Sequence, residues 1–399
     1  MQMNSHIKVW LKEKTSPSVL RWLRSGNSFA KSFHYWIPYS FMNGKALPPT
    51  HLTLDITYIC NLKCEMCPQA IDFESEDSNL LKEFKVRKEM TTEEIFQLID
   101  NASDYGVKIF TVTGGEPFLR KDILSIIERI KRRKMECQLL TNGMLLKETV
   151  AARLVELGVE KITISVDGPQ QIHNIIRKHQ NSFQRLLDGI KLIQEQKRQM
   201  GKRLPYLALS CTISATNAEY LAELADVAGE YGVNINFGYL YYISEKMEAQ
   251  TAKILKVEQA KGEDQNVAEY LKKIDPFVIE NQIKSIRQKE AQYGVKANFT
   301  PNLSPEEVRL RYEDDTHAYA NKCFYPWFHA RVNPYGDVYA CGPISIKMGN
   351  VTEQKFSHIW NNEKYRDFRK KLKKHQLFPK CTKCCALNNK LWSYLPSIS

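Results

Sequence analysis

Apolar and polar residues alternate along this chain with two different periods. From Thr91, a capping box completed by Glu94 opens a segment whose apolar residues recur three and four positions apart. A short apolar run, Ile109–Thr113, follows this segment. The pattern predicts an amphipathic helix that leads into a buried strand.

The same alternation of helix and strand recurs along the first 241 residues. The pattern predicts a first strand at 51–57, later helices at 121–133, 147–157, 181–198 and 217–231, and later strands at 137–141, 161–166, 206–213 and 234–241. Together they give six parallel strands, because right-handed crossovers place the helices outside the sheet. Such a sheet is either doubly wound or rolled into a complete or partial barrel.

The pattern changes outside this core. Residues 1–50 are basic and aromatic, and they either lie on a membrane surface or pack across the protein, with packing favoured. Residues 244–322 are predicted to form a helical connection or lid, because residues 245–296 are rich in Lys, Glu and Gln at helical spacing and show no strand pattern. Residues 323–399 are turn-rich and contain five cysteines, which predicts a separate small unit.

Composition excludes several classes of protein. The chain has 399 residues, 43% of them hydrophobic, without an apolar run of 18 or a recognisable signal peptide, so we expect a cytoplasmic protein. The formal charge of +12 is concentrated in runs such as 129–134 and 366–374, which are typical of solvated helix faces. No RNA-binding signature is present, and we expect no nucleic-acid partner.

Three cysteines, Cys60, Cys64 and Cys67, lie within eight residues directly after the first predicted strand. Three thiolates leave a tetrahedral metal or a four-iron cluster one ligand short, and an open position is where chemistry takes place. The alternative is a structural zinc site completed by a distant residue, although zinc loops usually pair cysteines as C-x2-C.

Polar residues and glycines follow three further predicted strands. They are Thr113–Pro117 (TGGEP), Thr141–Gly143 (TNG) and Ser165–Gly168 (SVDG). Alone, each is consistent with a tight turn before a helix. Since the carboxyl ends of parallel strands meet at one rim, these segments and the cysteine loop together predict a ligand pocket.

With these motifs, residues 51–241 resemble the radical S-adenosylmethionine (SAM) enzymes. The resemblance implies that Cys60, Cys64 and Cys67 hold a [4Fe–4S] cluster whose fourth iron is chelated by SAM. It also implies that Gly114, Gly115 and Glu116 meet the methionine amino group of the cofactor, and that Met66 lies beside the adenine. Ser165 and Arg177 resemble positions that contact the ribose or the methionine carboxylate, and Asp167 is a further candidate. The alternative for Arg177 is a surface arginine at a helix start.

The C-terminal cysteines resemble the SPASM/twitch extension of this family. Cys323, Cys341, Cys381 and Cys384 match its pattern together with Gly336, which implies one auxiliary [4Fe–4S] cluster with four protein ligands. Read in isolation, the same cysteines are also compatible with a zinc knuckle. Cys385 adjoins the set and is an alternative to Cys384.

The resemblance predicts an α/β fold, a partial (β/α)6 parallel barrel over residues 51–243 with a small cysteine-rich C-terminal domain. It implies that the enzyme reductively cleaves SAM to a 5′-deoxyadenosyl radical, with electrons from a flavodoxin- or ferredoxin-type donor. The favoured reaction is a two-electron oxidation of a small metabolite, sugar or aminocyclitol.

Three other functions remain open on the sequence. One is redox-neutral epimerisation, in which Cys211 returns a hydrogen atom, although Cys211 and Cys137 are more simply explained as buried inert thiols. A second is modification of a peptide or protein side chain, which we consider less favoured because only 59 residues precede Cys60. The third is a zinc-stabilised nucleic-acid-binding protein.

Overall fold

A computed structural model describes residues 34–70, 82, 86–258 and 273–387 of the chain. Residues 1–33, and with them most of the basic aromatic segment and its predicted membrane contact, lie outside the described residues. Residues 388–399, at the end of the predicted C-terminal unit, also lie outside them. No helix in the described part of the chain combines the length and the apolar character needed to cross a membrane.

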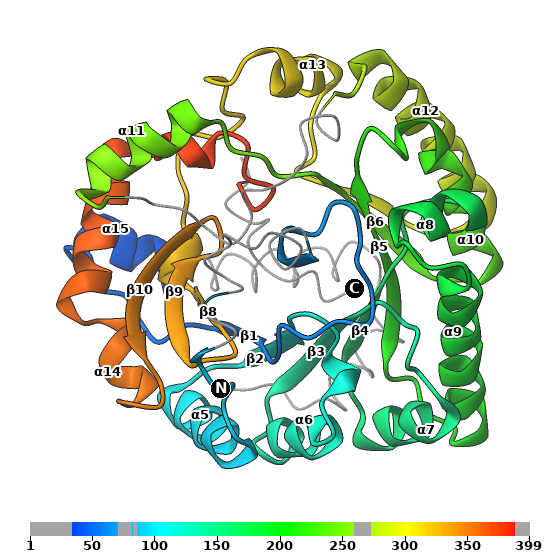
Figure 1. Cartoon of the computed structure of the whole chain (residues 1–399), viewed down its shortest axis with the longest axis horizontal. Coiled ribbons are helices and arrows are strands. Elements are labelled where there is room, and N and C mark those ends of the chain that lie inside the picture. Colours follow the sequence, from blue (N-terminus) through cyan, green and yellow to red (C-terminus); the bar gives the residue numbers. More distant parts are fainter. Residues whose placement is uncertain (1–33, 71–81, 83–85, 259–272, 388–399) are drawn as a thin grey trace, which may run out of the picture.

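The predicted helix–strand alternation forms a curved parallel sheet with helices along its outer side (Figure 1). The parallel strands follow each other in chain order: β1 (His51–Asp55), β2 (Ile109–Thr113), β3 (Glu136–Thr141), β4 (Lys161–Ser165), β5 (Tyr206–Ile213), β6 (Asn234–Tyr239) and β7 (Ala297–Thr300). The outer helices include α5 (Thr92–Tyr105), α6 (Ile123–Arg132), α7 (Glu148–Leu157), α9 (Ser182–Gln199), α10 (Leu221–Glu230) and α12 (Pro276–Tyr293). The α/β class and the partial barrel are confirmed. Strands β10 and β7 are the two ends of the sheet, and because they do not pair with each other the barrel is not closed.

Helix α5 shows how local sequence sets these elements. The Thr91 hydroxyl accepts a hydrogen bond from the amide of Glu94, and the Glu94 carboxylate accepts one from the amide of Thr91. Gly106 ends the helix at φ 112°, a left-handed conformation that glycine adopts without steric cost. The helix buries its predicted apolar face against the sheet, and the burial of that face contributes most of its stability.

The segment 244–322 is mainly helical. It contains the helices α11 (Glu245–Leu255), α12 and α13 (Pro305–Glu313), but it also supplies β7, a seventh parallel strand that pairs with β6. The six strands predicted over residues 51–241 are β1 to β6, and β7 is an additional parallel strand that the pattern did not predict. A four-residue strand is too short for its alternation to stand out from the helical pattern before it.

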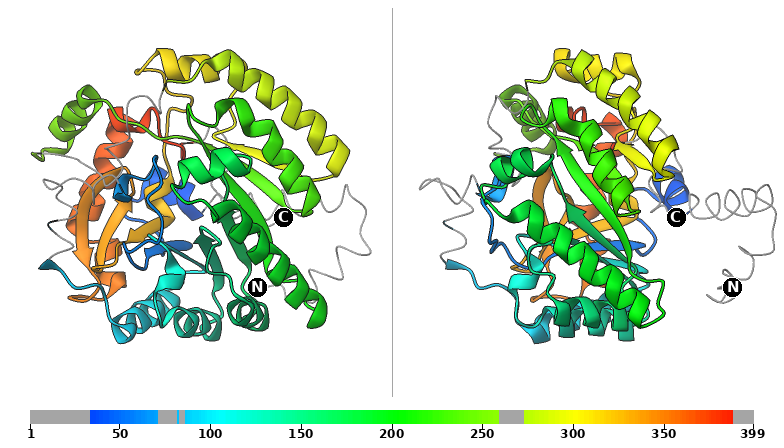
Figure 2. Two further views of the ribbon diagram at one scale, coloured as in Figure 1. Left: turned by 45° about the vertical axis from the view of Figure 1, so that its right-hand side comes forward. Right: turned by 90° about the vertical axis from the view of Figure 1, so that its right-hand side faces the viewer.

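The predicted cysteine-rich C-terminal region follows, and its strands join the sheet of the barrel. Strand β8 (His329–Val332) pairs in parallel with β1, and the antiparallel strands β9 (Asp337–Cys341) and β10 (Ile344–Asn350) extend the same ten-stranded sheet. Figure 2 shows these orange strands continuing the curve of the barrel beside β1. Helices α14 (Phe356–Trp360) and α15 (Glu363–His375) follow, and their buried residues belong to the same hydrophobic core as the barrel.

The described end of the N-terminal segment packs across the protein, as predicted. Residues 34–41 are helical, and the rings of Tyr35 and Tyr39 lie 5.4 and 4.7 Å from the ring of Phe324. Tyr39 also makes an edge-on contact with Trp327 at 4.9 Å. This helix therefore joins the beginning of the described chain to the cysteine-rich end.

Successive side chains of each strand point to opposite faces of the sheet. In β1, Leu52 and Leu54 are buried against the outer helices, whereas Thr53 faces the interior and bonds to His329 on β8 at 2.9 Å. Polar residues also occupy the inner face of the later strands. Polar side chains therefore face the interior of the barrel.

Candidate active site

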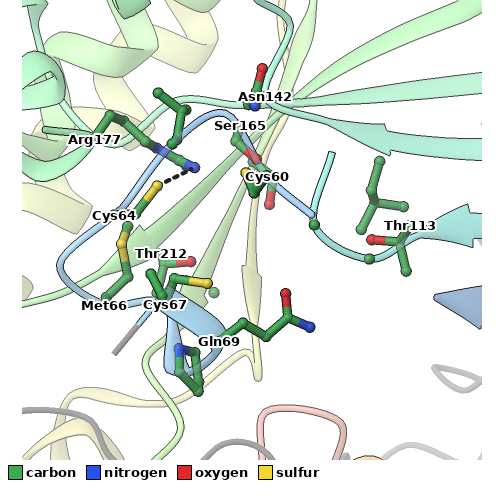
Figure 3. A pocket seen from close by; sticks show the side chains of 18 of the residues that line it. Cys60, Cys64, Met66, Cys67, Gln69, Thr113, Asn142, Ser165, Arg177 and Thr212 are labelled. Carbon is green, nitrogen blue, oxygen red and sulfur yellow. Dashed lines mark hydrogen bonds between the residues drawn. The ribbon is translucent and has the colours of Figure 1, made fainter. Parts of the chain in front are cut away.

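The three cysteines after β1 line a cavity of about 750 Å³ at the carboxyl ends of the strands. Cys64 is buried, whereas Cys60 is exposed and Cys67 is intermediate, and the three thiols interact electrostatically with one another. Figure 3 shows them facing the cavity together with Ser165 and Thr212. The structure thus gathers the predicted triplet and the predicted strand ends around one space.

The glycines of the TGGEP turn are required by close packing against the cysteine loop. A Cβ atom on Gly114 would lie 2.4 Å from the carbonyl oxygen of Thr57, and one on Gly115 would lie 2.2 Å from that of Ile59. The Gly115 amide instead donates to the Thr57 carbonyl at 2.7 Å. Both glycines line the cavity, so the turn fixes the base of the cysteine loop and shapes the pocket.

The Glu116 side chain is fully buried behind the cavity and is not among the residues that line it. Its carboxylate accepts hydrogen bonds from the Thr141 hydroxyl and the Asn142 amide, each at 2.8 Å, and from the Phe118 amide at 3.2 Å. Burial raises the pKa of Glu116, and these hydrogen bonds oppose the rise. The side chain ties the end of β2 to the end of β3; its contact with a cofactor stays a prediction.

Arg177 lies between a cysteine and a carboxylate. One guanidinium nitrogen donates to the Cys64 sulfur at 3.5 Å, shown as the dashed line in Figure 3, and the other forms an ion pair with Asp167. The Asp167 side chain is fully buried and also accepts from the Thr212 amide at 3.0 Å. Arg177 is therefore an inward-facing residue at the end of helix α8 (Gln170–Ile176), and the alternative of a surface arginine at a helix start is wrong.

Asp167 does not line the cavity, whereas Ser165, Met66 and Arg177 do. Asp167 acts on the pocket through Arg177, whose position it fixes. Met66 packs with Leu62 and Met144 in a small apolar cluster beside the cysteine loop. Their predicted contacts with SAM remain predictions.

The structure favours the interpretation of Cys211 as a buried inert thiol over the alternative of an inward hydrogen donor. Cys211 belongs to the hydrophobic core, its sulfur accepts from the Asn217 amide nitrogen at 3.6 Å, and its neighbours Ser210 and Thr212 line the cavity instead. Because side chains alternate along β5, the two polar neighbours leave Cys211 on the helical side. Cys137 is likewise buried in the core, as predicted for an inert thiol.

The second cysteine set lies outside the cavity. Cys341 ends β9, and Cys381 ends a 3-10 turn, Pro379–Cys381. Cys381 interacts electrostatically with Cys323 and Cys341, and Cys384 interacts with Cys323 and Cys381. Cys385, in contrast, lines the large cavity, which supports Cys384 as the fourth member of this set.

The chemistry of both donor sets fits iron–sulfur clusters. No three His, Cys, Asp or Glu side chains within the described ranges converge closely enough to hold a single metal ion, whereas thiols around a multi-atom cluster stand farther apart. Burial raises the pKa of Cys67, and it raises the pKa of Cys323 and Cys381 to about 12. Such thiols lose their protons when cationic iron binds.

Sequence reasoning missed four polar residues that line the cavity from β5 to β7. The missed residues are Ser210, Thr212, Asn236 and Thr300. Their signal is a polar residue at every second position of an otherwise buried strand. Asn142, in the predicted TNG segment, also lines the cavity. Its side-chain amide nitrogen donates to the side-chain oxygen of Asn61 in the cysteine loop at 2.8 Å.

Comparisons with known proteins agree with this geometry. Residues 54–207 match the model of the radical SAM superfamily, and residues 323–385 match that of an iron–sulfur cluster-binding domain, SPASM. The chain is 24% identical over 348 residues to an AdoMet-dependent heme synthase of Methanosarcina barkeri, covering 84% of this chain and 88% of that protein. It is 28% identical over 190 residues to a PqqA peptide cyclase of Granulibacter bethesdensis, covering 46% and 45%.

Solved structures share the fold. Streptococcus suis SuiB bound to S-adenosylmethionine aligns with a TM-score of 0.57 at 18% identity, covering 82% of this chain and 69% of that chain. The two domain matches imply a SAM-binding [4Fe–4S] cluster, SAM itself and auxiliary iron–sulfur binding. The chain belongs to the radical SAM superfamily and carries a C-terminal SPASM domain.

Proposed function

We propose that this protein is a radical SAM oxidoreductase that carries out a two-electron oxidation of a small polar metabolite, such as a sugar or aminocyclitol. One observation carries the proposal. The three-thiol set opens onto the large cavity, whereas none of Cys323, Cys341, Cys381 and Cys384 lines it. An incomplete ligand set in a pocket suits SAM, and a four-thiol set outside it suits a cluster that only takes up or relays electrons.

The protein residues position the reactants and exclude water. When bound, the first cluster and SAM supply the 5′-deoxyadenosyl radical that abstracts a substrate hydrogen. Cys60, Cys64 and Cys67 would hold that cluster, and Arg177, which lines the cavity, holds Cys64 and Asp167 together. An electron donor of the flavodoxin or ferredoxin type belongs to the same proposal.

Redox-neutral epimerisation is a second candidate, with a different thiol from the one predicted. Cys385 lines the cavity and Cys211 does not. A substrate radical that took a hydrogen atom from the Cys385 thiol would leave a thiyl radical, which needs one electron and one proton from an external donor to recover. Oxidation needs no such thiol.

The relatives do not favour a small molecule over a peptide. One relative is a PqqA peptide cyclase and another is a heme synthase, so a peptide or a tetrapyrrole is also a candidate substrate. Both classes therefore enter the test beside the small metabolites.

The test uses the anaerobically reconstituted protein with SAM and a reductant. The expected result is 5′-deoxyadenosine formed in equal amount with an oxidised product and without deuterium uptake at carbon from heavy water. Deuterium uptake that the Cys385→Ala variant loses would establish epimerisation instead. A colourless protein with stoichiometric zinc and no SAM cleavage would refute the radical enzyme altogether.

A further inference from the structure

Four uncharged polar side chains form one wall of the cavity. Ser210 and Thr212 come from β5, Asn236 from β6 and Thr300 from β7. In the sheet register, Ser210 pairs with Asn236, and Gly238 lies between Thr212 and Thr300. We call Ser210, Thr212, Asn236 and Thr300 the polar wall.

Most of the hydrogen-bonding capacity of the polar wall is unused within the protein. The Thr300 hydroxyl donates to the side-chain oxygen of Asn236 at 2.8 Å. For the Asn236 amide nitrogen and the hydroxyls of Ser210 and Thr212, the described residues provide no hydrogen-bond partner, and all three residues face the cavity. Polar groups in a pocket are satisfied by ligand or by water, so the wall is suited to a hydrogen-bonding ligand.

The charged side chains that line the cavity come from outside the polar wall. Among the described lining residues, the charged ones are Lys63, in the cysteine loop, and Arg177, at the end of α8, and there is no carboxylate. The polar wall therefore offers neutral donors and acceptors without an ionic partner. A neutral hydrogen-bonding group can satisfy these four side chains by itself, whereas a charged group would need compensation from outside the wall.

The spacing of the polar wall suits a compact ring. Neighbouring strands lie about 4.8 Å apart, and alternate residues of one strand lie about 6.6 Å apart, so the wall is a two-dimensional grid rather than a line. At the centre of this grid, Gly238 has no side chain, and a Cβ atom there would meet only the Cys211 carbonyl oxygen, at 3.8 Å. Backbone packing therefore does not require a glycine at this position, and the absence of a side chain leaves open space in the wall.

We propose that the polar wall is the substrate subsite and that it selects a neutral molecule carrying several hydroxyl groups. Hydroxyl groups donate and accept at once, and so they can satisfy serine, threonine and asparagine side chains together. The inference rests on the proposed radical SAM function and narrows its substrate class. It places apolar or multiply anionic substrates, such as a tetrapyrrole with several carboxylates, outside the preference of this site.

The first experiment measures 5′-deoxyadenosine formation by the reconstituted full-length enzyme with a panel of unphosphorylated sugars, nucleosides and cyclitols, beside coproporphyrin and a peptide panel. At least one polyhydroxylated compound is expected to raise the rate about tenfold over the substrate-free reaction. If no such compound raises it more than twofold, the inference is overturned while the radical SAM function stands. No 5′-deoxyadenosine under any condition would instead refute the proposed function.

Two variants locate the site, with a matched control. Asn236→Leu removes the amide from the wall, and Asn298→Leu makes the same change one strand away, in register with Asn236, at an exposed residue that does not line the cavity. The KM for the stimulating compound is expected to rise about tenfold in Asn236→Leu and less than twofold in Asn298→Leu. Equal effects of the two changes would overturn the assignment.

Gly238→Val gives an independent measurement if Asn236→Leu fails to fold. The added side chain enters open space, so the variant is expected to fold and bind its clusters while the KM rises at least tenfold. Folding is checked by circular dichroism and cluster loading by iron content. A folded, loaded Gly238→Val enzyme with an unchanged KM contradicts the proposed subsite.

Discussion

Arg177 contacts Cys64, a proposed cluster ligand, and the buried carboxylate of Asp167 at the same time, so its charge acts on both. Its loss removes the hydrogen bond to Cys64 and leaves Asp167 buried without its ion-pair partner. We expect the Arg177→Met enzyme to show a midpoint potential of the first cluster that is lower by tens of millivolts, because a nearby cation and hydrogen bonds to sulfur favour the reduced state. A potentiometric titration followed by EPR measures this shift.

Arg185→Met is the matched control for that variant. Arg185 is exposed on α9, so its removal changes the net charge equally without touching the site. A similar shift in both variants would mean that overall charge, and not the contact with Cys64, sets the potential.

A pair of histidines inside the barrel predicts a pH dependence of stability. His51 bonds to Thr111 at 2.7 Å, its ring lies 4.9 Å from that of His329, and burial lowers the pKa of His51 to about 4. Below its ordinary pKa of 6.5, the unfolded chain binds a proton at His51 that the folded protein rejects. The contribution of His51 to the free energy of unfolding is therefore fully present above pH 6.5. It decreases by up to about 3 kcal/mol as the pH falls toward 4.

The prediction is tested by comparing apparent unfolding free energies at pH 7 and pH 5 in two variants. His51→Asn is expected to reduce the dependence on pH, whereas His358→Asn, at an exposed position of α14, is expected to keep that of the native protein. An unchanged dependence in His51→Asn would show that other groups carry the acid sensitivity.

The residue types at the site were more predictable than the directions of their side chains. The spacing of Cys60, Cys64 and Cys67 fixes them in one loop, so proximity follows from covalent geometry. Asp167 does not face the cavity, because helix α8 places Arg177 between the Asp167 carboxylate and the cavity. The local sequence pattern does not contain that information. The outward direction of Cys211 was available from its polar neighbours Ser210 and Thr212.

Among the elements, α15 contributes a buried arginine, Arg369, that bonds to several other segments of the fold. Arg369 donates to the carbonyls of Pro326 at 2.8 Å and Gly44 at 3.2 Å and to the Asn361 side chain at 3.0 Å, and burial lowers its pKa to about 10. Its guanidinium also lies 4.2 Å from the ring centre of Trp360. It thereby connects three segments that are far apart in the sequence.

Arg369→Met is expected to lower the free energy of unfolding by about 2–4 kcal/mol, because three buried acceptors lose their donor. Lys374→Met, at an exposed position of the same helix, is expected to change it by less than about 0.5 kcal/mol. Denaturant unfolding of the apo-proteins compares them. A loss of similar size in both would contradict the bridging role of Arg369.

The elements with long, regular periodicity matched their predictions, and the short ones did not. Strands β1 to β6 and the helices between them were predicted from pattern, since each repeats its period several times. Strand β7 has four residues, and β8 has four residues whose partner, β1, lies more than 270 positions earlier. Pairing of this kind is decided by tertiary contacts rather than by local sequence.

For the molecule as a whole, one sheet and one core predict a single unfolding transition of the apo-protein. All six tryptophans lie before residue 37 or after residue 326, so their fluorescence reports on the two ends of the chain, whereas far-UV circular dichroism is dominated by the barrel helices. The two signals are expected to change at the same denaturant concentration. A fluorescence change at a lower denaturant concentration would indicate that the C-terminal region unfolds as a separate unit, as the sequence suggested.

The pairing of β1 with β8 also has a consequence for biosynthesis. Residues 329–332 leave the ribosome roughly 270 positions after residues 51–54, which at about 5–20 residues per second is on the order of 15–55 seconds later. Throughout that interval, the edge of β1 that leads into Cys60 has no partner from β8. We therefore expect the cysteine loop after β1 to be accessible during synthesis, before β8 pairs with β1, to the machinery that delivers iron and sulfur.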